Sequence, residues 1–430
     1  MELSRKVFAN YVAWFKTPCS LGGRGQWLHW DNNRERSCKH NPDKIDPTTG
    51  LRDIASVHYP LIGPYDSVDP NVIEYHIMLA QAAGIDGFIV EWFGKDDARD
   101  VDKATLVLRD KIKEINSNYG TDFRLLLAWE DSYAGGNKEE AISTLEYAWK
   151  NYMSDQSVYV WDEKKKAPIL LVFPYFTGPR RSFRPGELLS IIDRLKICPV
   201  FSYHFPQVNE EGGFLNVRGV ESIYAWVIAH SWDGTEWGKS NLDLFYDFLK
   251  GNKKNMEFAI AGCYPGFDDV GVGACWICNP KNKKAHRFIK RDSRKCNTYD
   301  LTWKRFWQYI ESFESDKDVP VPWMQIVTWN DWNEGTEIEP SIDRIGREGV
   351  DYGFGYGYEY LKKTKEHVRA FKGISETPDE ALYIPHLIYN ARIKAKKNRP
   401  LQDAEQKLTN AVTSFFSGRY KDALSIIQTV

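Results

Sequence analysis

The stretch Gly87-Phe-Ile-Val-Glu-Trp92 is an almost uninterrupted apolar run of strand length. Such runs are typical of strands in parallel sheets, which helices cover on both faces. Counting this one, taken as 87–93, eight runs occur along the chain, the others at 7–15, 123–129, 169–175, 200–204, 222–227, 258–264 and 324–329. They alternate with segments of helical periodicity. This alternation predicts an α/β fold, a (β/α)8 TIM barrel, in preference to an open doubly wound sheet.

Helix signals fill the segments between the predicted strands. Asp69 and Pro70 supply a cap and a first-turn proline before an apolar-periodic stretch that Gly84 ends. Further helices are expected at 101–115, 138–152, 185–195, 241–249, 301–313 and 358–371. Beyond them, helical spacing continues at 381–397 and at 404–427, around a turn at Ser417 and Gly418. We therefore expect a barrel domain, 1–375, with a long first loop, and a C-terminal helical cap, 376–430.

The composition is that of a globular protein without a basic excess. The 430 residues include 57 Lys and Arg against 59 Asp and Glu, a formal net charge of -2. This balance does not favour binding to nucleic acid or to an anionic membrane surface. No apolar run approaches the roughly 20 residues that span a bilayer. Aromatic residues make up 14% of the chain, and their rings form platforms on which sugars stack, so carbohydrate is the expected ligand.

Neither a cofactor nor a partner subunit is expected. No Gly-rich dinucleotide fingerprint follows the first predicted strand, and no His-rich strand end indicates a catalytic metal. We expect a monomer. The first ten residues lack a charged region followed by an apolar one, so the sequence as written shows no signal peptide. The expected location is outside the cytoplasm if Met1 replaces a removed signal, and the cytoplasm otherwise.

Acidic residues follow the predicted strands, and active sites of (β/α)8 barrels lie at the C-terminal ends of their strands. These acids are Glu91, Glu130, Asp131, Asp268, Asp269, Asp331 and Glu334. Asp331 and Glu334 are three residues apart just beyond the eighth run, where one turn brings both carboxyls to one side. Glycoside hydrolysis needs such a pair, one acid to protonate the departing oxygen and one to activate a nucleophile or stabilise positive charge. We predict that this pair is catalytic; the competing interpretation is a helix cap.

Residues 16–70 form a long first loop rich in Gly, Asn, Asp and Pro, which we expect to cover the strand-end face and to form part of a sugar cleft. The predicted substrate-binding residues come from this loop and from the strand ends: Trp14, Trp30, His58, Tyr65, Glu91, Trp92, Glu130, Trp226, Tyr264, Asn330, Trp332 and Asn333. Tryptophans at several strand ends, Trp129 among them, favour an open groove and internal cleavage. For each single tryptophan, core packing is the competing interpretation.

Three motifs occur in order along the barrel sequence. They are His58-Tyr-Pro-Leu-Ile-Gly-Pro-Tyr-Asp-Ser-Val-Asp-Pro70, Ala83-Gly-Ile-Asp-Gly-Phe-Ile-Val-Glu-Trp-Phe-Gly94 and Trp329-Asn-Asp-Trp-Asn-Glu-Gly-Thr-Glu-Ile-Glu-Pro-Ser341. Over about residues 7 to 371 the chain resembles glycoside hydrolase family 99, the endo-α-1,2-mannosidases and mannanases, which have (β/α)8 barrels. The family usually has Glu where this chain has Asp331, and His where it has Asn333. The Trp329-Asn-Asp-Trp tetrad with Glu334 is also similar to family 71, the α-1,3-glucanases.

The resemblance to family 99 implies a mechanism with retention. Asp331 would deprotonate the substrate's own 2-hydroxyl, which attacks the anomeric carbon to give a 1,2-anhydro sugar, and Glu334 would act as acid and then as base. The shorter Asp331 matters, because errors of ~1 Å can cost about a hundredfold in rate. We therefore expect an endo-acting α-mannosidase. The alternatives are an α-glucanase, an inverting route through water, and a carbohydrate-binding barrel with impaired catalysis.

Seven cysteines leave at least one free thiol in a monomer. Cys275-Trp-Ile-Cys278, followed by His286 and Cys296, matches in part the spacing of a structural zinc site. A disulfide or free thiols are together favoured over zinc.

Overall fold

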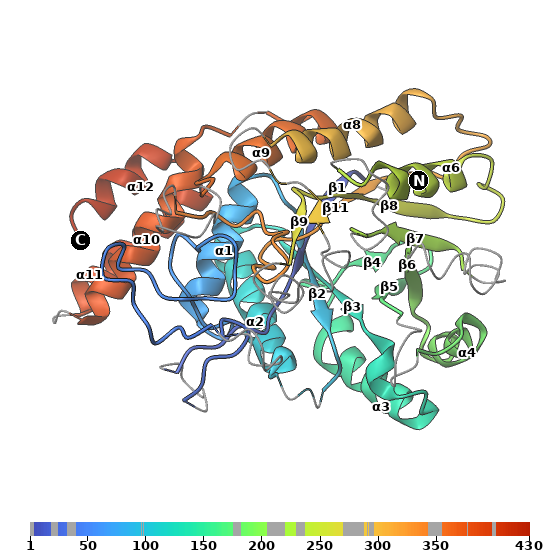
Figure 1. The fold of residues 1–430 in the computed structure, drawn as a ribbon, viewed down its shortest axis with the longest axis horizontal. Coiled ribbons are helices and arrows are strands. Elements are labelled where there is room, and N and C mark those ends of the chain that lie inside the picture. The colour runs from blue at the N-terminus through green and yellow to red at the C-terminus, as the bar shows by residue number, and fades with distance from the viewer. Residues whose placement is uncertain are drawn as a thin grey trace, which may run out of the picture.

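The computed structural model describes residues 4–18, 25–31, 40–95, 97, 99–174, 182–203, 220–228, 237–269, 288–289, 291, 296–342, 355–375, 377–397 and 401–430. Eight parallel strands close into a barrel that helices surround (Figure 1). The barrel strands are β1 (Lys6–Tyr11), β2 (Gly87–Trp92), β3 (Arg124–Trp129), β5 (Ala167–Val172), β6 (Cys198–Tyr203), β7 (Ser222–Ala225), β8 (Phe258–Cys263) and β11 (Trp323–Ile326). Pairing of β3 with β5 and of β11 with β1 completes the ring. The predicted fold is confirmed, and each predicted strand has a counterpart.

The barrel helices lie where the sequence predicts them, within a few residues at each end. They are α1 (Pro70–Ala82), α2 (Val101–Tyr119), α3 (Lys138–Ala148), α4 (Pro185–Leu195), α6 (Lys239–Leu249), α8 (Asn297–Glu311) and α9 (Glu359–Lys372). Helix α1 begins as expected, because Asp69 Oδ1 accepts a hydrogen bond from the backbone N–H of Asn71 at 2.8 Å and Pro70 occupies the first turn. Gly84, at φ +81°, follows its end.

Short elements beyond the predicted pattern decorate both ends of the barrel. Strand β4 (Trp161–Asp162) pairs antiparallel with the start of β5. Strands β9 (Phe267–Asp268) and β10 (Phe288–Ile289) form a separate antiparallel pair after β8. A 3-10 turn, η1 (Asp131–Ala134), follows β3, and a π-helical turn, η2 (Trp149–Met153), extends α3. Strands of two residues carry no period-2 pattern, so the sequence does not reveal them.

Alternation of side chains along β2 separates two neighbours that the sequence analysis assigns to one site. Trp92 lies beside Trp129 of β3 in the strand register, and both indoles are fully buried. The Trp92 Nε1–H donates to Asp102 of α2 at 2.9 Å, which places this side chain on the helix side of the sheet. Glu91, one residue earlier, therefore points to the barrel axis.

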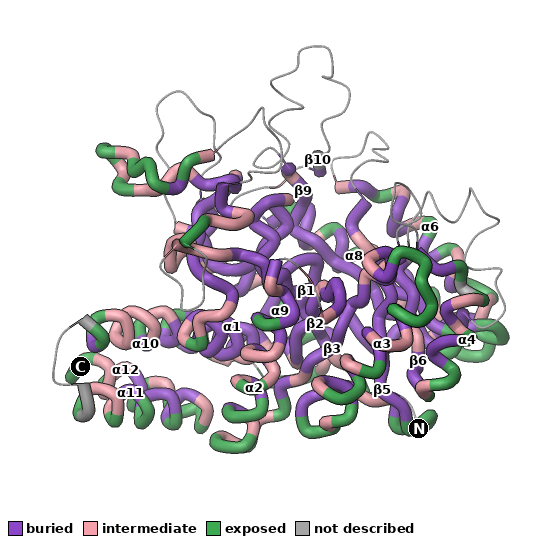
Figure 2. The backbone as a smooth tube through the Cα atoms, turned by 90° about the horizontal axis from the view of Figure 1, so that it is seen from below, coloured by how far each residue is buried: buried purple, intermediate pink, exposed green. Residues whose placement is uncertain are grey.

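The C-terminal tail forms three helices beside α1. They are α10 (Glu380–Lys397), α11 (Leu401–Phe416) and α12 (Tyr420–Ile427), and Figures 1 and 2 place them at the side of the barrel. Arg392 Nε donates to Glu74 of α1 at 2.8 Å, and the rings of Tyr389 and Tyr75 lie 5.7 Å apart. The apolar residues that these helices bury belong to the same cluster as the barrel core. The tail covers the outer face of α1, while the division into two domains stays a prediction.

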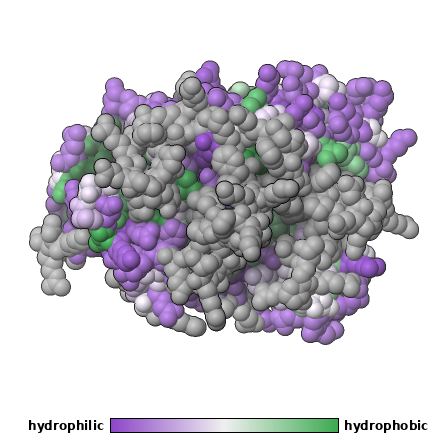
Figure 3. Space-filling model, viewed as in Figure 1, coloured by the Kyte–Doolittle hydropathy of each residue, from purple (hydrophilic) through white to green (hydrophobic). Residues whose placement is uncertain are grey.

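Burial is highest in the barrel strands and decreases toward the outer faces of the helices. In Figure 2 the strands run through a buried interior, and exposed residues lie on the outer faces of the helices. The described surface in Figure 3 is mostly hydrophilic, interrupted by small hydrophobic areas. Among the described helices, none combines the length and the apolar character needed to cross a bilayer.

Candidate active site

The segment after β11, Thr328–Glu339, folds back on itself and is here named the β11 loop. Thr328 N–H donates to the Thr336 carbonyl, and Glu339 N–H donates to the Trp329 carbonyl, each at 2.8 Å. From residue 321 to residue 341 every residue is buried except Glu334, which is partly exposed. The loop therefore presents a single acidic side chain to the solvent-accessible end of the barrel.

Asp331 lies beneath Glu334 in the same loop, with 5% of its surface exposed. Its Oδ1 accepts hydrogen bonds from the backbone N–H groups of Asn333 and Glu334, each at 3.1 Å, and its own N–H donates to Thr328 Oγ1 at 2.8 Å. Burial raises the pKa of Asp331 well above its usual range, and the charges of Glu334 and Glu91 raise it further. The two acids thus interact strongly, as a pair that shares protons must.

Two more partly exposed acids lie at the ends of β2 and β3. Burial raises the pKa of Glu91 to about 8; the charges of Glu130 and Glu334 raise it too, and the charge of Arg99 opposes them. Glu130 Oε1 accepts a hydrogen bond from Ser132 Oγ at 2.9 Å. These mutual effects require the carboxyls to be near one another. The structure therefore gathers Glu91 and Glu130 around the predicted catalytic pair.

The described parts of loop 16–70 lie against the β11 loop, as predicted. Asn333 Nδ2 donates to the carbonyls of His29 at 2.9 Å and Ala55 at 2.8 Å. Pro60 forms an antiparallel bridge with Ser341 at the far end of the same segment. Asn333, which was predicted to bind substrate, thus connects two segments of the first loop with the β11 loop.

Four tryptophans predicted to bind substrate are buried, which favours the competing interpretation of core packing. Trp30 and Trp332 are fully buried, and Trp14 is 8% exposed. The ring of His29 stacks on Trp14 at 4.8 Å and that of Phe15 on Trp30 at 4.2 Å. Trp92 faces helix α2, as described above. Their role as sugar platforms stays a prediction.

Tyr65, Asn330 and Tyr264 are likewise internal, with their polar groups engaged. Asn330 Oδ1 accepts from the Val12 N–H at 2.9 Å, and its Nδ2 donates to the Val12 carbonyl at 3.0 Å, which fixes the β11 loop to the end of β1. The Tyr65 hydroxyl donates to Glu339 Oε2 at 2.8 Å. Tyr264 OH donates to the Trp237 carbonyl at 3.1 Å. Their contribution to a site is to hold it in place.

Trp226 is the predicted aromatic that stays partly exposed. It follows β7, and the ring of Phe173, which follows β5, meets it edge-on with centroids 4.8 Å apart. In the closed ring β5 lies opposite β11. Phe173 therefore stands across the barrel mouth from Asp331 and Glu334, and Trp226 packs against it from β7, two strands from β11.

His58 belongs to a buried cluster that sequence reasoning missed. Its Nδ1 lies 2.9 Å from Glu337 Oε1, to which Arg291 Nη1 donates at 2.8 Å. Burial and the charge of Arg291 lower the pKa of His58. Burial favours a high pKa for Glu337, but the charge of Arg291 and the hydrogen bond of His58 outweigh it and lower that pKa. His58 thus joins the first loop to the β11 loop below the surface.

The cysteine prediction is settled only for Cys296, which is a free, buried thiol. Cys275, Cys278 and His286 lie outside the described residues. Within the described ranges, no group of three or more His, Cys, Asp or Glu side chains is arranged to hold a metal ion.

Paired carboxyls at the C-terminal end of a closed (β/α)8 barrel are the arrangement that glycoside hydrolysis needs. The model of glycosyl hydrolase family 99 matches residues 2–373, and the chain belongs to this family. The predicted family resemblance is confirmed.

Named relatives are distant. The chain is 22% identical over 377 residues to the glycoprotein endo-alpha-1,2-mannosidase-like protein of Danio rerio, covering 84% of this chain and 77% of that protein. It is 23% identical over 354 residues to the glycoprotein endo-alpha-1,2-mannosidase of Rattus norvegicus, covering 79% and 68%. The solved GH99 endo-alpha-mannosidase from Bacteroides thetaiotaomicron shares the fold, with a TM-score of 0.55 and 18% identity over 86% of this chain and 99% of that one.

Proposed function

We propose that this glycoside hydrolase is an endo-acting α-mannosidase whose catalytic pair is Asp331 and Glu334. The observation that carries the proposal is the burial pattern of the β11 loop, in which Glu334 alone between residues 321 and 341 is partly exposed, directly above Asp331. Relatives named as endo-alpha-1,2-mannosidases support the substrate class. Membership of family 99 supports the reaction class.

The chemistry follows in two steps. Asp331 takes the proton of the substrate 2-hydroxyl, O2 attacks the anomeric carbon, and Glu334 gives its proton to the departing glycosidic oxygen, which leaves a 1,2-anhydro sugar. Water then loses a proton to Glu334 and attacks the anomeric carbon, and Asp331 returns its proton to O2. Two inversions at one carbon give retention overall. Each carboxyl ends in the protonation state in which it began.

The surroundings of Asp331 suit a general base. Its Oδ1 is occupied by two backbone N–H groups, which leaves Oδ2 as the oxygen that the loop's own backbone does not use. A raised pKa makes the carboxylate a stronger base toward a weakly acidic sugar hydroxyl. The two N–H groups also fix its direction, so less reorganisation is needed when the proton moves.

Internal cleavage is supported by the spread of side chains around the barrel mouth. Acids stand at β2, β3 and the β11 loop, and Phe173 and Trp226 stand at β5 and β7. A site with binding surfaces on both sides of the scissile bond accepts the interior of a chain. Early products decide the point: a spread of oligosaccharides supports internal cleavage, and monosaccharide alone in the first minutes contradicts it.

The decisive experiment is a reducing-end assay on a panel of α-mannans and α-glucans, with the product anomer followed by NMR. Release from an α-1,2-linked mannan with an α-anomer as first product is the expected result. A β-anomer as first product refutes the retaining mechanism. Binding of mannan without any release identifies a barrel that binds carbohydrate but has lost catalysis.

A second candidate, an α-glucanase, rests on one residue. Asp331 stands where family 99 relatives usually have Glu, and the same Asp occurs in the family 71 α-1,3-glucanases that the motif resembles. Release from an α-1,3-glucan with none from mannan would select this reading over the mannosidase. The panel above contains both substrates.

A further inference from the structure

We infer that Glu339 is a positioning residue of the catalytic pair, acting through the two side chains that flank Asp331. The inference rests on the proposed function and adds a residue to it. Glu339 lies eight positions beyond Asp331 at the end of the β11 loop, and it is fully buried. It therefore reaches the reaction through other residues, without touching a sugar.

The carboxyl of Glu339 is the hub of a buried network. Its Oε2 accepts hydrogen bonds from the Tyr65 hydroxyl at 2.8 Å and from Trp332 Nε1 at 3.0 Å. Its Oε1 lies 3.1 Å from Nε2 of His76, an ion-pair contact, and His76 Nδ1 lies 3.1 Å from the Tyr11 hydroxyl. The hub thereby connects the first loop, helix α1 and strand β1 with the β11 loop.

The direction of these hydrogen bonds shows how Glu339 fixes side chains of the β11 loop. Asn330 Nδ2 donates to the Tyr65 oxygen at 3.1 Å, so the Tyr65 hydrogen is free to go to Glu339. An indole N–H is a donor only, so Trp332 also needs an acceptor here. Glu339 consequently orients both Asn330 and Trp332, the residues immediately before and after Asp331.

Glu337, two residues earlier, shows that burial alone does not give this role. Its Oε1 binds His58 and Arg291, and neither contact reaches a neighbour of Asp331. Glu339 is the acid whose partners flank the predicted base. Loss of its acceptor should let Asp331 shift, and a displacement of ~1 Å can cost about a hundredfold in rate.

The central test compares two substitutions at this position. Glu339→Leu removes the acceptor and should lower kcat by at least about tenfold, with KM within about threefold, because the pair acts in the transition state more than in binding. Glu339→Gln keeps one oxygen for Tyr65 and Trp332 and places a polar amide nitrogen beside His76. It should therefore recover most of the lost kcat.

A matched control exists in helix α2. Asp102 is a buried carboxyl that also accepts from an indole, that of Trp92 at 2.9 Å, and from a tyrosine hydroxyl, that of Tyr152 at 2.6 Å. Asp102→Leu should lower the melting temperature as Glu339→Leu does, yet leave kcat within about twofold of wild type. Should Glu339→Leu fail to fold, Tyr65→Phe breaks the same path by removing one hydroxyl, and its kcat should fall with KM unchanged.

Non-additivity separates positioning from general damage. In a Glu334→Gln background, Glu339→Leu should lower kcat little further, because the pair that it positions is already disabled. A full additional loss would overturn the inference, as would an unchanged kcat in folded Glu339→Leu. A crystal structure of this variant with Asp331 and Glu334 in their original places would also overturn it, even if no substrate were cleaved. Failure of the wild-type enzyme on every glycan, by contrast, would refute the proposed function alone.

Discussion

The two ends of the barrel differ in how they treat charge. At the C-terminal end, the charge of Glu334 helps to raise the pKa values of Glu91 and Asp331, and the charge of Glu91 raises that of Asp331 further. At the N-terminal end, acids are paired with cations: Glu257 lies 3.1 Å from Lys165. Keeping like charges together costs stability, and an enzyme keeps such an arrangement where chemistry needs it.

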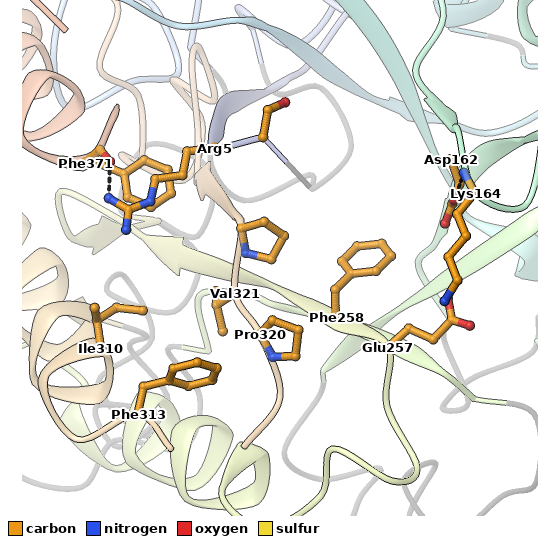
Figure 4. Close-up of a pocket in the computed structure, with 12 residues that line it drawn as sticks. Arg5, Asp162, Lys164, Glu257, Phe258, Ile310, Phe313, Pro320, Val321 and Phe371 are labelled. Carbon is orange, nitrogen blue, oxygen red and sulfur yellow. Dashed lines mark hydrogen bonds between the residues drawn. The ribbon is translucent and has the colours of Figure 1, made fainter. Parts of the chain in front are cut away.

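A hollow at the N-terminal end of the barrel extends this contrast. The N-terminal end holds a hollow of about 520 Å³ lined by apolar side chains such as Phe258 and Phe313 (Figure 4). Arg5 lines it as well, but its guanidinium donates to the Phe371 carbonyl at 2.7 Å. The Lys164 side chain extends toward Glu257 across the rim. Glu257, which lines this hollow, is paired with Lys165, whereas Glu91 and Asp331 at the C-terminal end are surrounded by other acids.

The largest expected effect comes from removing the exposed acid. Glu334→Gln should cut turnover by at least about a hundredfold, because a general acid typically contributes that much or more. The melting temperature should change little, since this residue is partly exposed. Glu257→Gln at the other end is the control and should retain activity. Near-normal turnover in Glu334→Gln would remove this residue from the catalytic pair.

Replacing the buried acid should be comparably harmful and should leave a mark on the pH profile. Asp331→Asn should lower turnover by about a hundredfold, because the amide cannot take the hydroxyl proton. The wild-type rate should rise with pH as Asp331 ionises, so the variant should lose this acidic limb. Measurement of kcat/KM from pH 4 to pH 9 tests both statements. A mild effect with the limb intact would transfer the base role to Glu91 or Glu130.

A smaller effect is expected from the aromatic side of the mouth. Trp226→Ala should raise KM by about tenfold, which corresponds to ~1.4 kcal/mol of lost stacking, with kcat nearly unchanged. Trp161, on β4 at the N-terminal end, is also partly exposed, with its Nε1 donating to the Met153 carbonyl. Trp161→Ala should leave KM unaltered. Equal KM values for the two variants would take Trp226 out of the substrate site.

The fold, and the closeness of Asp331 to Glu334, could be predicted from the sequence because their causes are local. Apolar runs mark the buried strands, and the acids of the β11 loop follow the last run directly. The direction of individual side chains was harder to predict. Glu91 and Trp92 both end the second run, yet the pleat of the strand directs Glu91 to the barrel axis and Trp92 to Asp102. A period-2 reading of this strand would have separated them.

Long-range partners explain what the sequence analysis missed. Glu337 and Glu339 appear in the sequence as two more acids after the pair, but their roles depend on Arg291 and His76, which are distant along the chain. Nothing local distinguishes His76 from any other helix residue. The same holds for Trp30, whose burial depends on Phe15 and on the backbone of Tyr65.

The last expected effect concerns stability, and its sign reverses between the two ends. Burial and the neighbouring acids raise the pKa of Glu91 from 4.5 to about 8, so the folded protein holds a proton that the unfolded chain has lost between these pH values. Stability therefore falls as pH rises through this window, and the penalty is complete only above about pH 8. Glu91→Gln mimics the protonated form. It should stabilise the protein little at pH 5 and by ~2 kcal/mol at pH 8, since one pKa unit corresponds to ~1.4 kcal/mol and the neighbouring acids absorb part of the shift.

Glu257→Gln makes the same chemical change where the acid is paired with Lys165, and it should weaken the fold slightly at pH 8, by ~0.5 kcal/mol. Thermal unfolding of both variants and of wild type at pH 5 and pH 8 gives the comparison. A gain for Glu91→Gln that is equal at both pH values would mean that crowding of the acids is not its cause. A gain for Glu257→Gln would mean that the N-terminal end also carries uncompensated negative charge, and the contrast between the two ends would then fail.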